Sequence, residues 1–299
     1  MTKRRYWTVD AFTRTRYHGN PAAVVFDAEG LSQAEMQTIA REMNLSETIF
    51  VLPPTEPSAD YWSRIFTPQH ELPFAGHPTL ATAYAMYTSK RAKPESGDNV
   101  LRQQCGIGVV PVEIQEDGDD MRFLMTQGKP CYRDADVDRD LAASMLGCDP
   151  SDIGDTPVEI VSTGLWWMIP PVRTLKAMAG LCPNQQLIEE VCRDREATGI
   201  TTFCPDAAGA DASYRIRSFV PGEGVPEDPV CGSGNGSTAA YLAKHRYPNQ
   251  SSFTYIAEQG VEMERNGQVF VHCERATNGQ LTVRVGGNAV QVMEGELYT

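Results

Sequence analysis

A long-range internal similarity constrains the fold of this chain more than any other sequence feature. The pattern Arg-x-Phe-x-Pro occurs at residues 64–68 and again at residues 217–221, an offset of 153 residues. Each copy is followed by Glu-x-Pro-x-x-Gly, at residues 71–76 and 227–232, now offset by 156 residues. The length of 299 residues fits two domains at about 150 residues each. We therefore predict a duplicated, two-domain architecture.

The segments after the two glycine loops lack a charged face. They read Leu-Ala-Thr-Ala-Tyr-Ala-Met at residues 80–86 and Ser-Thr-Ala-Ala-Tyr-Leu-Ala at residues 237–243. A helix that is apolar all round is buried, so each domain is expected to be a sheet wrapped around a central helix. In the first copy, Pro78 suits the first helical position, which would make His77 the cap.

A third helix is predicted over residues 32–43. Ser32 and Glu35 have the spacing of a capping box, and Asn44 is expected to end the helix in a left-handed turn. Glu47 then lies just before the next strand. Aligning Phe50 with Phe203 places Ile200 opposite Glu47, so the acid occurs in one half only.

Composition excludes several classes of protein. Lys+Arg 26 against Asp+Glu 39 gives a net charge of −13, which repels nucleic acid. Neither a signal-peptide core nor an apolar run near the ~20 residues of a spanning helix is present. The 8 cysteines are scattered without a Cys-x-x-Cys pair. A reduced, cytoplasmic protein without a membrane or nucleic-acid partner is expected.

The two glycine loops are candidate binding elements. If the halves are related by a pseudo-twofold axis, both loops and both helix N-termini face the interdomain cleft. Helix N-termini offer free N–H groups and a positive dipole end, so the pair would receive a carboxylate-bearing small molecule. The alternative is that the loops are only tight turns into core helices. Residues 232–237 (Gly-Ser-Gly-Asn-Gly-Ser) do not match a Walker or dinucleotide-binding loop.

Several motifs together resemble one family. They are Val-Asp-Ala-Phe-Thr (9–13), Asn-Leu-Ser-Glu-Thr (44–48), Phe-Thr-Pro-x-x-Glu-x-Pro-x-x-Gly-His-Pro-Thr (66–79) and Glu-Asp-Pro-Val-Cys-Gly-Ser-Gly-Asn-Gly-Ser (227–237). The chain resembles the phenazine-biosynthesis (PhzF-like) isomerases and, more remotely, diaminopimelate epimerase and proline racemase. The resemblance implies an α+β fold of two pseudo-symmetric domains, each a curved, mainly antiparallel sheet around a central helix, usually in a homodimer. We expect domains over residues 1–118, with 286–299 as a candidate completing segment, and 119–285.

The resemblance also implies site residues. The glutamate of the Ser-Glu-Thr motif is Glu47, which inherits the role of proton-shuttling acid/base. His77, Asp228 and Ser233 are expected to hold polar groups of the substrate and guide the proton. The loop residues Gly76, Gly232, Gly234 and Cys231 complete the candidate binding set.

Simpler structural roles remain open for these residues. Glu47 could be a surface loop residue, Asp228 a turn-stabilising residue and Ser233 a simple turn residue. Cys231 is a departure from the family pattern. In two-base epimerases, a cysteine precedes the glycine of both loops, whereas here Ala75 occupies the other position. A two-thiol mechanism is therefore excluded, but a Glu47/Cys231 pair is not, and an inert, packed Cys231 is a further alternative.

The reading that best fits these features is an isomerase without metal or organic cofactor. It would move a proton within a small carboxylate-bearing substrate, with Glu47 acting first as base and then as acid. An amino-acid epimerase or racemase using Glu47 with Cys231 is the alternative enzyme. A non-catalytic small-carboxylate binding protein is the alternative of another class. The adjacent pair Trp166-Trp167 is interpreted as one ring packed inward and one at an interface, not as a cofactor site.

Overall fold

The computed structural model describes residues 2–95, 98–118, 120–209 and 211–299. Contacts within the chain divide it into two compact units, Met1–Met125 with Gly286–Thr299 and Thr126–Val285. Within the part of the chain that is described, no helix is long and apolar enough to cross a membrane.

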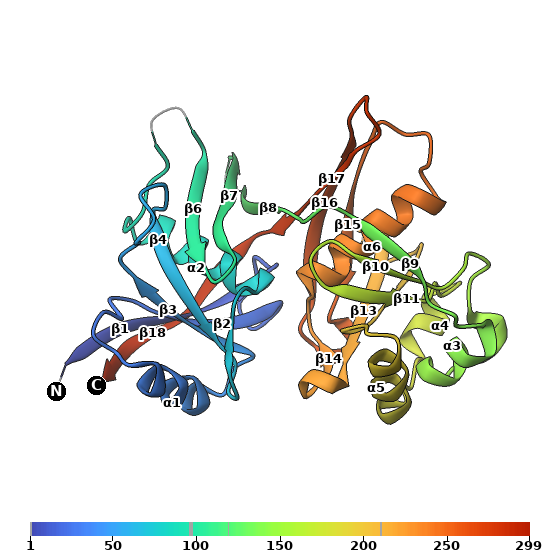
Figure 1. The fold of residues 1–299 in the computed structure, drawn as a ribbon, viewed down its shortest axis with the longest axis horizontal. Coiled ribbons are helices and arrows are strands. Elements are labelled where there is room, and N and C mark those ends of the chain that lie inside the picture. The colour runs from blue at the N-terminus through green and yellow to red at the C-terminus, as the bar shows by residue number, and fades with distance from the viewer. Residues whose placement is uncertain (1, 96–97, 119, 210) are drawn as a thin grey trace. The chain divides into compact units, whose positions relative to one another are not determined.

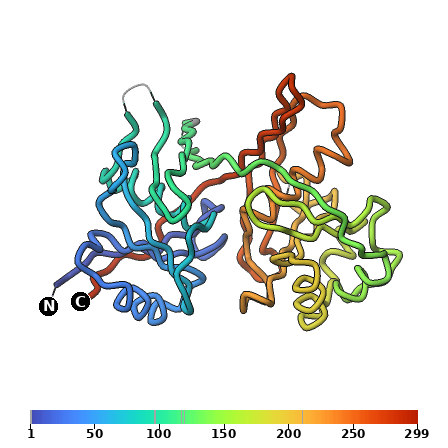
Figure 2. Tube along the Cα trace, viewed as in Figure 1, coloured from blue at the N-terminus to red at the C-terminus, as the bar shows by residue number. Residues whose placement is uncertain are grey.

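The first unit is a mainly antiparallel sheet built around one helix. β2 is parallel to β3, β3 is antiparallel to β4, and β4 is parallel to β6. Its elements are β1 (Lys3–Ala11), β2 (Asn20–Val25), α1 (Gln33–Met43), β3 (Glu47–Leu52), β4 (Tyr61–Phe66), β5 (Glu71–Leu72), α2 (Gly76–Thr88), β6 (Val100–Cys105), β7 (Gly108–Asp117), β8 (Asp120–Thr126) and β18 (Ala289–Tyr298). The last strand, β18, returns to lie antiparallel beside β1 (Figures 1 and 2).

The second unit repeats this order of pairings. β11 is parallel to β12, β12 is antiparallel to β13, and β13 is parallel to β15. Its elements are β9 (Cys131–Asp134), α3 (Arg139–Leu146), η1 (Pro150–Asp152), β10 (Glu159–Ser162), β11 (Trp166–Ile169), α4 (Leu175–Ala179), α5 (Gln185–Asp194), β12 (Gly199–Cys204), β13 (Tyr214–Val220), η2 (Pro221–Glu223), β14 (Val225–Asp228), α6 (Gly232–His245), β15 (Ser252–Gln259), η3 (Val261–Met263), β16 (Gly267–Arg275) and β17 (Leu281–Gly287).

Each unit has a central helix that is almost wholly buried, as the apolar segments predict. Nine of the 13 residues of α2 and eleven of the 14 residues of α6 are buried. α2 contacts β1, β2, β3 and β18, whereas α6 contacts β10, β11, β12 and β16. Figure 1 shows α2 among the strands of the first unit and α6 among those of the second. The predicted α+β fold of two similar sheet-and-helix units is confirmed.

The internal repeat extends to side-chain chemistry. Arg64 donates two hydrogen bonds of 2.7 Å to the carboxylate of Glu71. Arg217 donates two of 2.8 Å to that of Glu227. Each guanidinium also lies over the phenylalanine two residues further along its strand, 5.3 Å and 5.1 Å from the ring centre. Paired, charge-assisted hydrogen bonds of this kind fix the strand to the loop that leads into the central helix.

Helix α1 begins and ends as predicted. The Ser32 hydroxyl accepts from the backbone N–H of Glu35, and the Glu35 carboxylate accepts from the backbone N–H of Ser32, which completes the capping box. Asn44 ends the helix in the left-handed conformation, with φ 50°. The chain can therefore turn sharply into β3, which places Glu47 at the first position of that strand.

The start of α2 differs from the prediction, because His77 is not its cap. The helix begins at Gly76 and the capping residue is Ala75, in an extended conformation. The carbonyl of Ala75 accepts from both the N–H and the hydroxyl of Thr79. These bonds carry the helix two residues further back than Pro78, so the His77 side chain is left to pair elsewhere.

Candidate active site

In the first unit, Glu47 and His77 form a close, poorly exposed pair. The Oε2 atom of Glu47 lies 2.9 Å from Nε2 of His77. The side chains are 15% and 8% exposed, respectively. Glu47 begins β3 and His77 is the second residue of α2, so the fold joins two residues that are 30 positions apart in the sequence. A carboxylate held by an imidazole in a partly buried setting is a suitable acid/base group.

The pair lies at the start of a helix and beside a small residue. His77 lies in the first turn of α2, where free backbone N–H groups and the helix dipole provide positive potential. Ala22 is the residue paired with Glu47 on the adjacent parallel strand. Its methyl side chain takes up little room, so the glutamate side chain can extend towards α2. Gly76, the first residue of that helix, adjoins His77 directly.

In the second unit, the start of α6 gathers the remaining candidate residues. Cys231 is the capping residue, and its sulfur accepts from the N–H of Gly234 at 3.4 Å. A Cβ atom at Gly234 would lie 3.0–3.3 Å from Thr201, Ser218 and the Cys231 sulfur, so this position fits only a glycine without strain. Gly232 is the first helical residue and is buried, whereas Ser233 keeps some exposure.

The surroundings of Cys231 favour the protonated thiol over the thiolate. Burial is the main cause that raises the pKa of this thiol, and the nearby Asp228 carboxylate raises it further. The hydrogen bonds from Ser233 and Gly234 oppose this effect but do not overcome it. A thiol with a raised pKa is a poor base at neutral pH.

Asp228 stabilises a turn in this loop. Its Oδ1 atom accepts from the N–H of Val230 at 3.1 Å, which is the geometry of an Asx turn. Gln259, on β15, fixes the same loop from behind. Its amide donates to the carbonyl of Asp228 and accepts from the N–H of Cys231 and from Asn235. The loop before α6 is thus held by a buried side chain.

The counterpart of Glu47 in the second unit is Gly199, not Ile200. Thr48 pairs with Phe66 across β3 and β4, and Ile200 pairs with Phe219 across β12 and β13. Since Phe66 and Phe219 are equivalent in the repeat, their partners Thr48 and Ile200 are equivalent too. The residues that precede these partners, Glu47 and Gly199, must therefore also correspond. Aligning Phe50 with Phe203 is therefore wrong by one residue. A Cβ atom at Gly199 would lie 2.4 Å from the carbonyl oxygen of Phe219, so the backbone leaves no room there for a side chain.

A contact that sequence reasoning missed joins Trp167 to Ser233. The indole Nε1–H donates to Ser233 Oγ at 3.2 Å. Trp167 is 2% exposed, which agrees with the expectation that one ring of the tryptophan pair packs inward. The other ring, Trp166, lies under the guanidinium of Arg133 at 4.4 Å. The adjacent tryptophans were the available signal, but nothing in the sequence linked them to residue 233.

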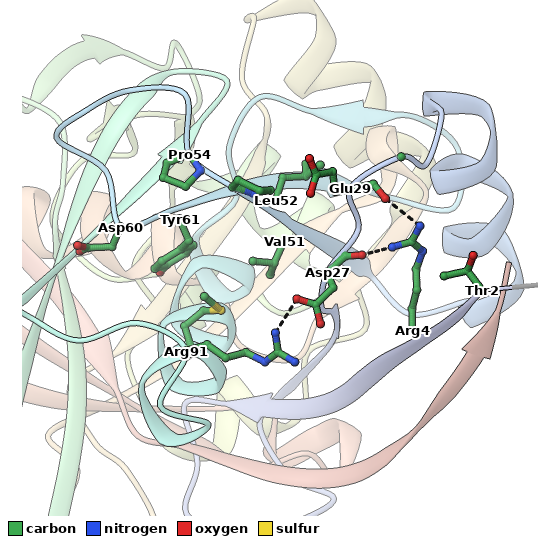
Figure 3. Close-up of a pocket in the computed structure, with 13 residues that line it drawn as sticks. Thr2, Arg4, Asp27, Glu29, Val51, Leu52, Pro54, Asp60, Tyr61 and Arg91 are labelled. Carbon is green, nitrogen blue, oxygen red and sulfur yellow. Dashed lines mark hydrogen bonds and ion pairs between the residues drawn. The ribbon is translucent and has the colours of Figure 1, made fainter.

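A separate hollow in the first unit contains none of the predicted site residues. It measures about 730 Å³ and is lined by residues that include Arg4, Asp27 and Arg91 (Figure 3). Arg4 donates to the carbonyls of Asp27 and Glu29, and Arg91 pairs with the Asp27 carboxylate at 2.7 Å. The two guanidinium groups are thus occupied by the protein itself, and we assign the hollow no function.

Comparison with known proteins identifies the family. A family model described as phenazine biosynthesis-like protein matches residues 9–295. A trans-2,3-dihydro-3-hydroxyanthranilate isomerase of Pseudomonas aeruginosa is 35% identical over 295 residues, covering 98% of this chain and 99% of the relative. A crystal structure of a PhzF-family phenazine biosynthesis protein from Bacillus anthracis is 30% identical and has a TM-score of 0.91. The match covers 100% of both chains. A hydroxyproline epimerase from Agrobacterium vitis, 13% identical over 99% of this chain and 91% of its own, shares the fold with a TM-score of 0.64.

The fold of two sheet-wrapped helices and these likenesses define the class of protein, which is an isomerase. More particularly, the chain belongs to the phenazine biosynthesis-like, or PhzF-like, family.

Proposed function

We propose that this protein is a cofactor-independent isomerase in which Glu47 removes a proton from one carbon of a small carboxylate-bearing substrate and returns it to another. The observation that carries the proposal is the Glu47–His77 pair, 2.9 Å apart and poorly exposed at the start of a buried helix. As base, Glu47 takes the proton and becomes neutral while the substrate gains the electron pair. As acid, it gives the proton back, which restores the carboxylate.

His77 is proposed to orient the glutamate. Its Nε2 atom lies against Glu47 Oε2, and this oxygen is buried. The other carboxylate oxygen, Oε1, is then the one available for proton transfer. A carboxylate that is already held in place loses little conformational entropy when it approaches the reacting carbon. This saving of entropy is a substantial part of enzymatic rate enhancement.

The loop residues are proposed to bind the substrate. Gly76 lies at the start of α2, and Gly232 and Gly234 lie at the start of α6, where backbone N–H groups are suited to bind a carboxylate or a developing negative charge. Ser233 would donate a hydrogen bond to the substrate carboxylate. Asp228, whose Oδ1 accepts from the N–H of Val230, would hold a polar substrate group during proton transfer.

One observation disfavours a second acid at the counterpart of Glu47, and another disfavours the Glu47/Cys231 alternative. Gly199, the counterpart of Glu47, has no side chain and no space for one. Burial raises the pKa of the Cys231 thiol, which keeps it from acting as a base. We therefore rank the epimerase or racemase second, and the packed, inert role for Cys231 first.

The relatives suggest the first compound to assay. The Pseudomonas relative carries the name of an isomerase of trans-2,3-dihydro-3-hydroxyanthranilate, a small cyclic carboxylate. We propose this compound, or one that shares its carboxylate and its activated C–H bond, as substrate. We also propose a homodimer on the basis of the family resemblance, which light scattering would test.

The proposed function is tested by isotope exchange. The wild-type protein is incubated with trans-2,3-dihydro-3-hydroxyanthranilate in D₂O, and product formation and deuterium content are followed by NMR. Isomerisation with partial deuterium entry is expected, because one carboxylate returns the proton on the face from which it was taken. Binding without isomerisation or exchange would favour the non-catalytic alternative. Racemisation of an amino acid would favour the epimerase.

A further inference from the structure

We propose that Trp167 is a positioning residue, which holds Ser233 as a directed hydrogen-bond donor to the carboxylate of the substrate. This inference rests on the proposed function, because it assumes that Ser233 contacts a carboxylate. It assigns a role to a residue that the sequence motifs do not include.

In the repeat, the side chain of Trp167 in the second unit occupies the place that corresponds to the side chain of Glu47 in the first unit. In the first unit, Ala22 on β2 pairs with Glu47 on β3. In the second, Trp167 on β11 pairs with Gly199 on β12. The first unit thus pairs the small Ala22 with the long, acidic Glu47. The second unit pairs the large Trp167 with Gly199, which has no side chain. A Cβ atom at Gly199 would lie 3.2 Å from the Trp167 ring, so the indole covers the position from which a glutamate would extend.

Both side chains reach the same position of the central helix. Glu47 lies 2.9 Å from His77, the second residue of α2, and Trp167 lies 3.2 Å from Ser233, the second residue of α6. The group that contacts this position is a proton acceptor in the first unit and an N–H donor in the second. The indole N–H has no basic lone pair. The second unit therefore carries a binding element where the first carries a base.

The hydrogen bonds at Ser233 determine where its proton points. The hydroxyl oxygen accepts from the indole N–H, and the Cys231 sulfur lies 3.5 Å away. Because this oxygen already accepts from the indole N–H, its own proton cannot point at the ring and is directed away from Trp167. The Ser233 O–H can then donate to a ligand on the side away from the indole. A hydroxyl oriented in this way is suited to an anionic oxygen.

Burial explains why the tryptophan can fix this geometry. Trp167 is 2% exposed and belongs to a strand paired on both sides, so its ring has little freedom to move. Ser233 is less buried, so its hydroxyl proton has access to a ligand. An oriented donor on a rigid support is the arrangement that favours tight binding of a carboxylate.

The first part of the test needs no substrate. The chain has 4 tryptophans, so a ¹H–¹⁵N spectrum should show their indole N–H signals, and the Trp167→Phe variant identifies the signal of Trp167. In Ser233→Ala, a shift of that signal and not of the others is expected, because its acceptor is lost. An unchanged Trp167 signal in folded Ser233→Ala would overturn the inference. This variant truncates a small, partly exposed side chain, so we expect it to fold.

The second part separates binding from chemistry, with trans-2,3-dihydro-3-hydroxyanthranilate as the probe. Trp167→Phe keeps most of the ring but lacks the N–H, and it should raise KM about tenfold with kcat within about threefold, as for one lost hydrogen bond to a charged group. Ser233→Ala should do the same, and the double variant should be no worse than Ser233→Ala alone. Trp166→Phe is the matched control and should leave both constants unchanged.

The outcomes distinguish this inference from the proposed function. Additive effects of the two substitutions, a fall in kcat at unchanged KM, or equal effects of Trp166→Phe and Trp167→Phe would overturn the role of Trp167. The proposed function would survive these results if Glu47→Gln were still inactive. A wild-type protein that neither binds nor converts the probe would overturn both the proposed substrate and the role of Ser233 as a donor to it.

Discussion

The carboxylate of Glu47 lies 2.9 Å from the imidazole of His77, across the start of a buried helix. The equivalent position in the second unit holds a tryptophan N–H against a serine hydroxyl, 3.2 Å apart. One duplicated framework thus supports two different kinds of contact. The acid/base chemistry proposed for this protein depends on this difference between the units.

Replacement of Glu47 by Gln should abolish most of the turnover. The amide keeps the size of the side chain but cannot accept a proton, so kcat should fall by at least about 10²-fold while binding persists. Glu47→Asp should also lose most activity, because the shorter side chain no longer reaches the reacting carbon. The measurement is kcat of the folded variants, and turnover of Glu47→Gln within threefold of wild type would contradict the assignment.

His77 should be replaceable only by a residue with a donor in the same place. His77→Leu removes the contact with Glu47 and should lower kcat by about 10²-fold. His77→Gln places an amide N–H near the position of Nε2 and should recover a substantial part of that loss. Steady-state kinetics of the two variants, side by side, provide the comparison. Equal activity of the two would mean that the contact with Glu47 plays no part in catalysis.

Cys231 should prove dispensable for chemistry. Cys231→Ala or Cys231→Thr should keep turnover within about tenfold of wild type, since loss of an acid/base group costs about 10²–10⁴-fold. Because burial raises the pKa of this thiol, it should also be alkylated at pH 8 far more slowly than the exposed Cys131. Mass spectrometry of the labelled protein measures that rate. A hundredfold loss of turnover in folded Cys231→Ala would instead support the epimerase alternative.

The two repeated ion pairs should differ in their contribution to stability. The side chains of Arg217 and Glu227 are 6% and 16% exposed, against 19% and 29% for Arg64 and Glu71. Glu227→Gln should lower the free energy of unfolding by about 3 kcal/mol, because the buried guanidinium of Arg217 loses its nearest counter-charge and keeps only Glu262, at 4.0 Å. Glu71→Gln, the matched control, should lower it by about 1 kcal/mol. Urea denaturation compares the two, and equal losses would show that burial does not set the difference.

Chelation should leave activity unchanged if the enzyme works without metal. Among the described residues, no group of three or more His, Cys, Asp and Glu side chains is arranged to hold an ion. Turnover measured after dialysis against EDTA should equal that of untreated protein, because the proton transfer proposed for Glu47 uses no metal ion. A loss that zinc restores would contradict the proposed mechanism.

The sequence alone determined the duplicated architecture, because the features that specify it are local. The repeated proline turns and glycine loops, the apolar segments that become α2 and α6, and the Ser32–Glu35 cap all act within a few residues. The family motifs likewise indicated the candidate residues, from Glu47 to Ser233. None of these inferences required knowledge of which strands pair.

Tertiary structure decided what depends on strand register and on side-chain direction. A shift of one residue moves every side chain of a strand to its other face, and only the pairing of Ile200 with Phe219 made Gly199 the counterpart of Glu47. The helix start at Gly76 was likewise settled by bonds to the Ala75 carbonyl. The contact of Trp167 with Ser233 joins residues 66 positions apart. Such contacts arise from packing between distant segments, which no local pattern encodes.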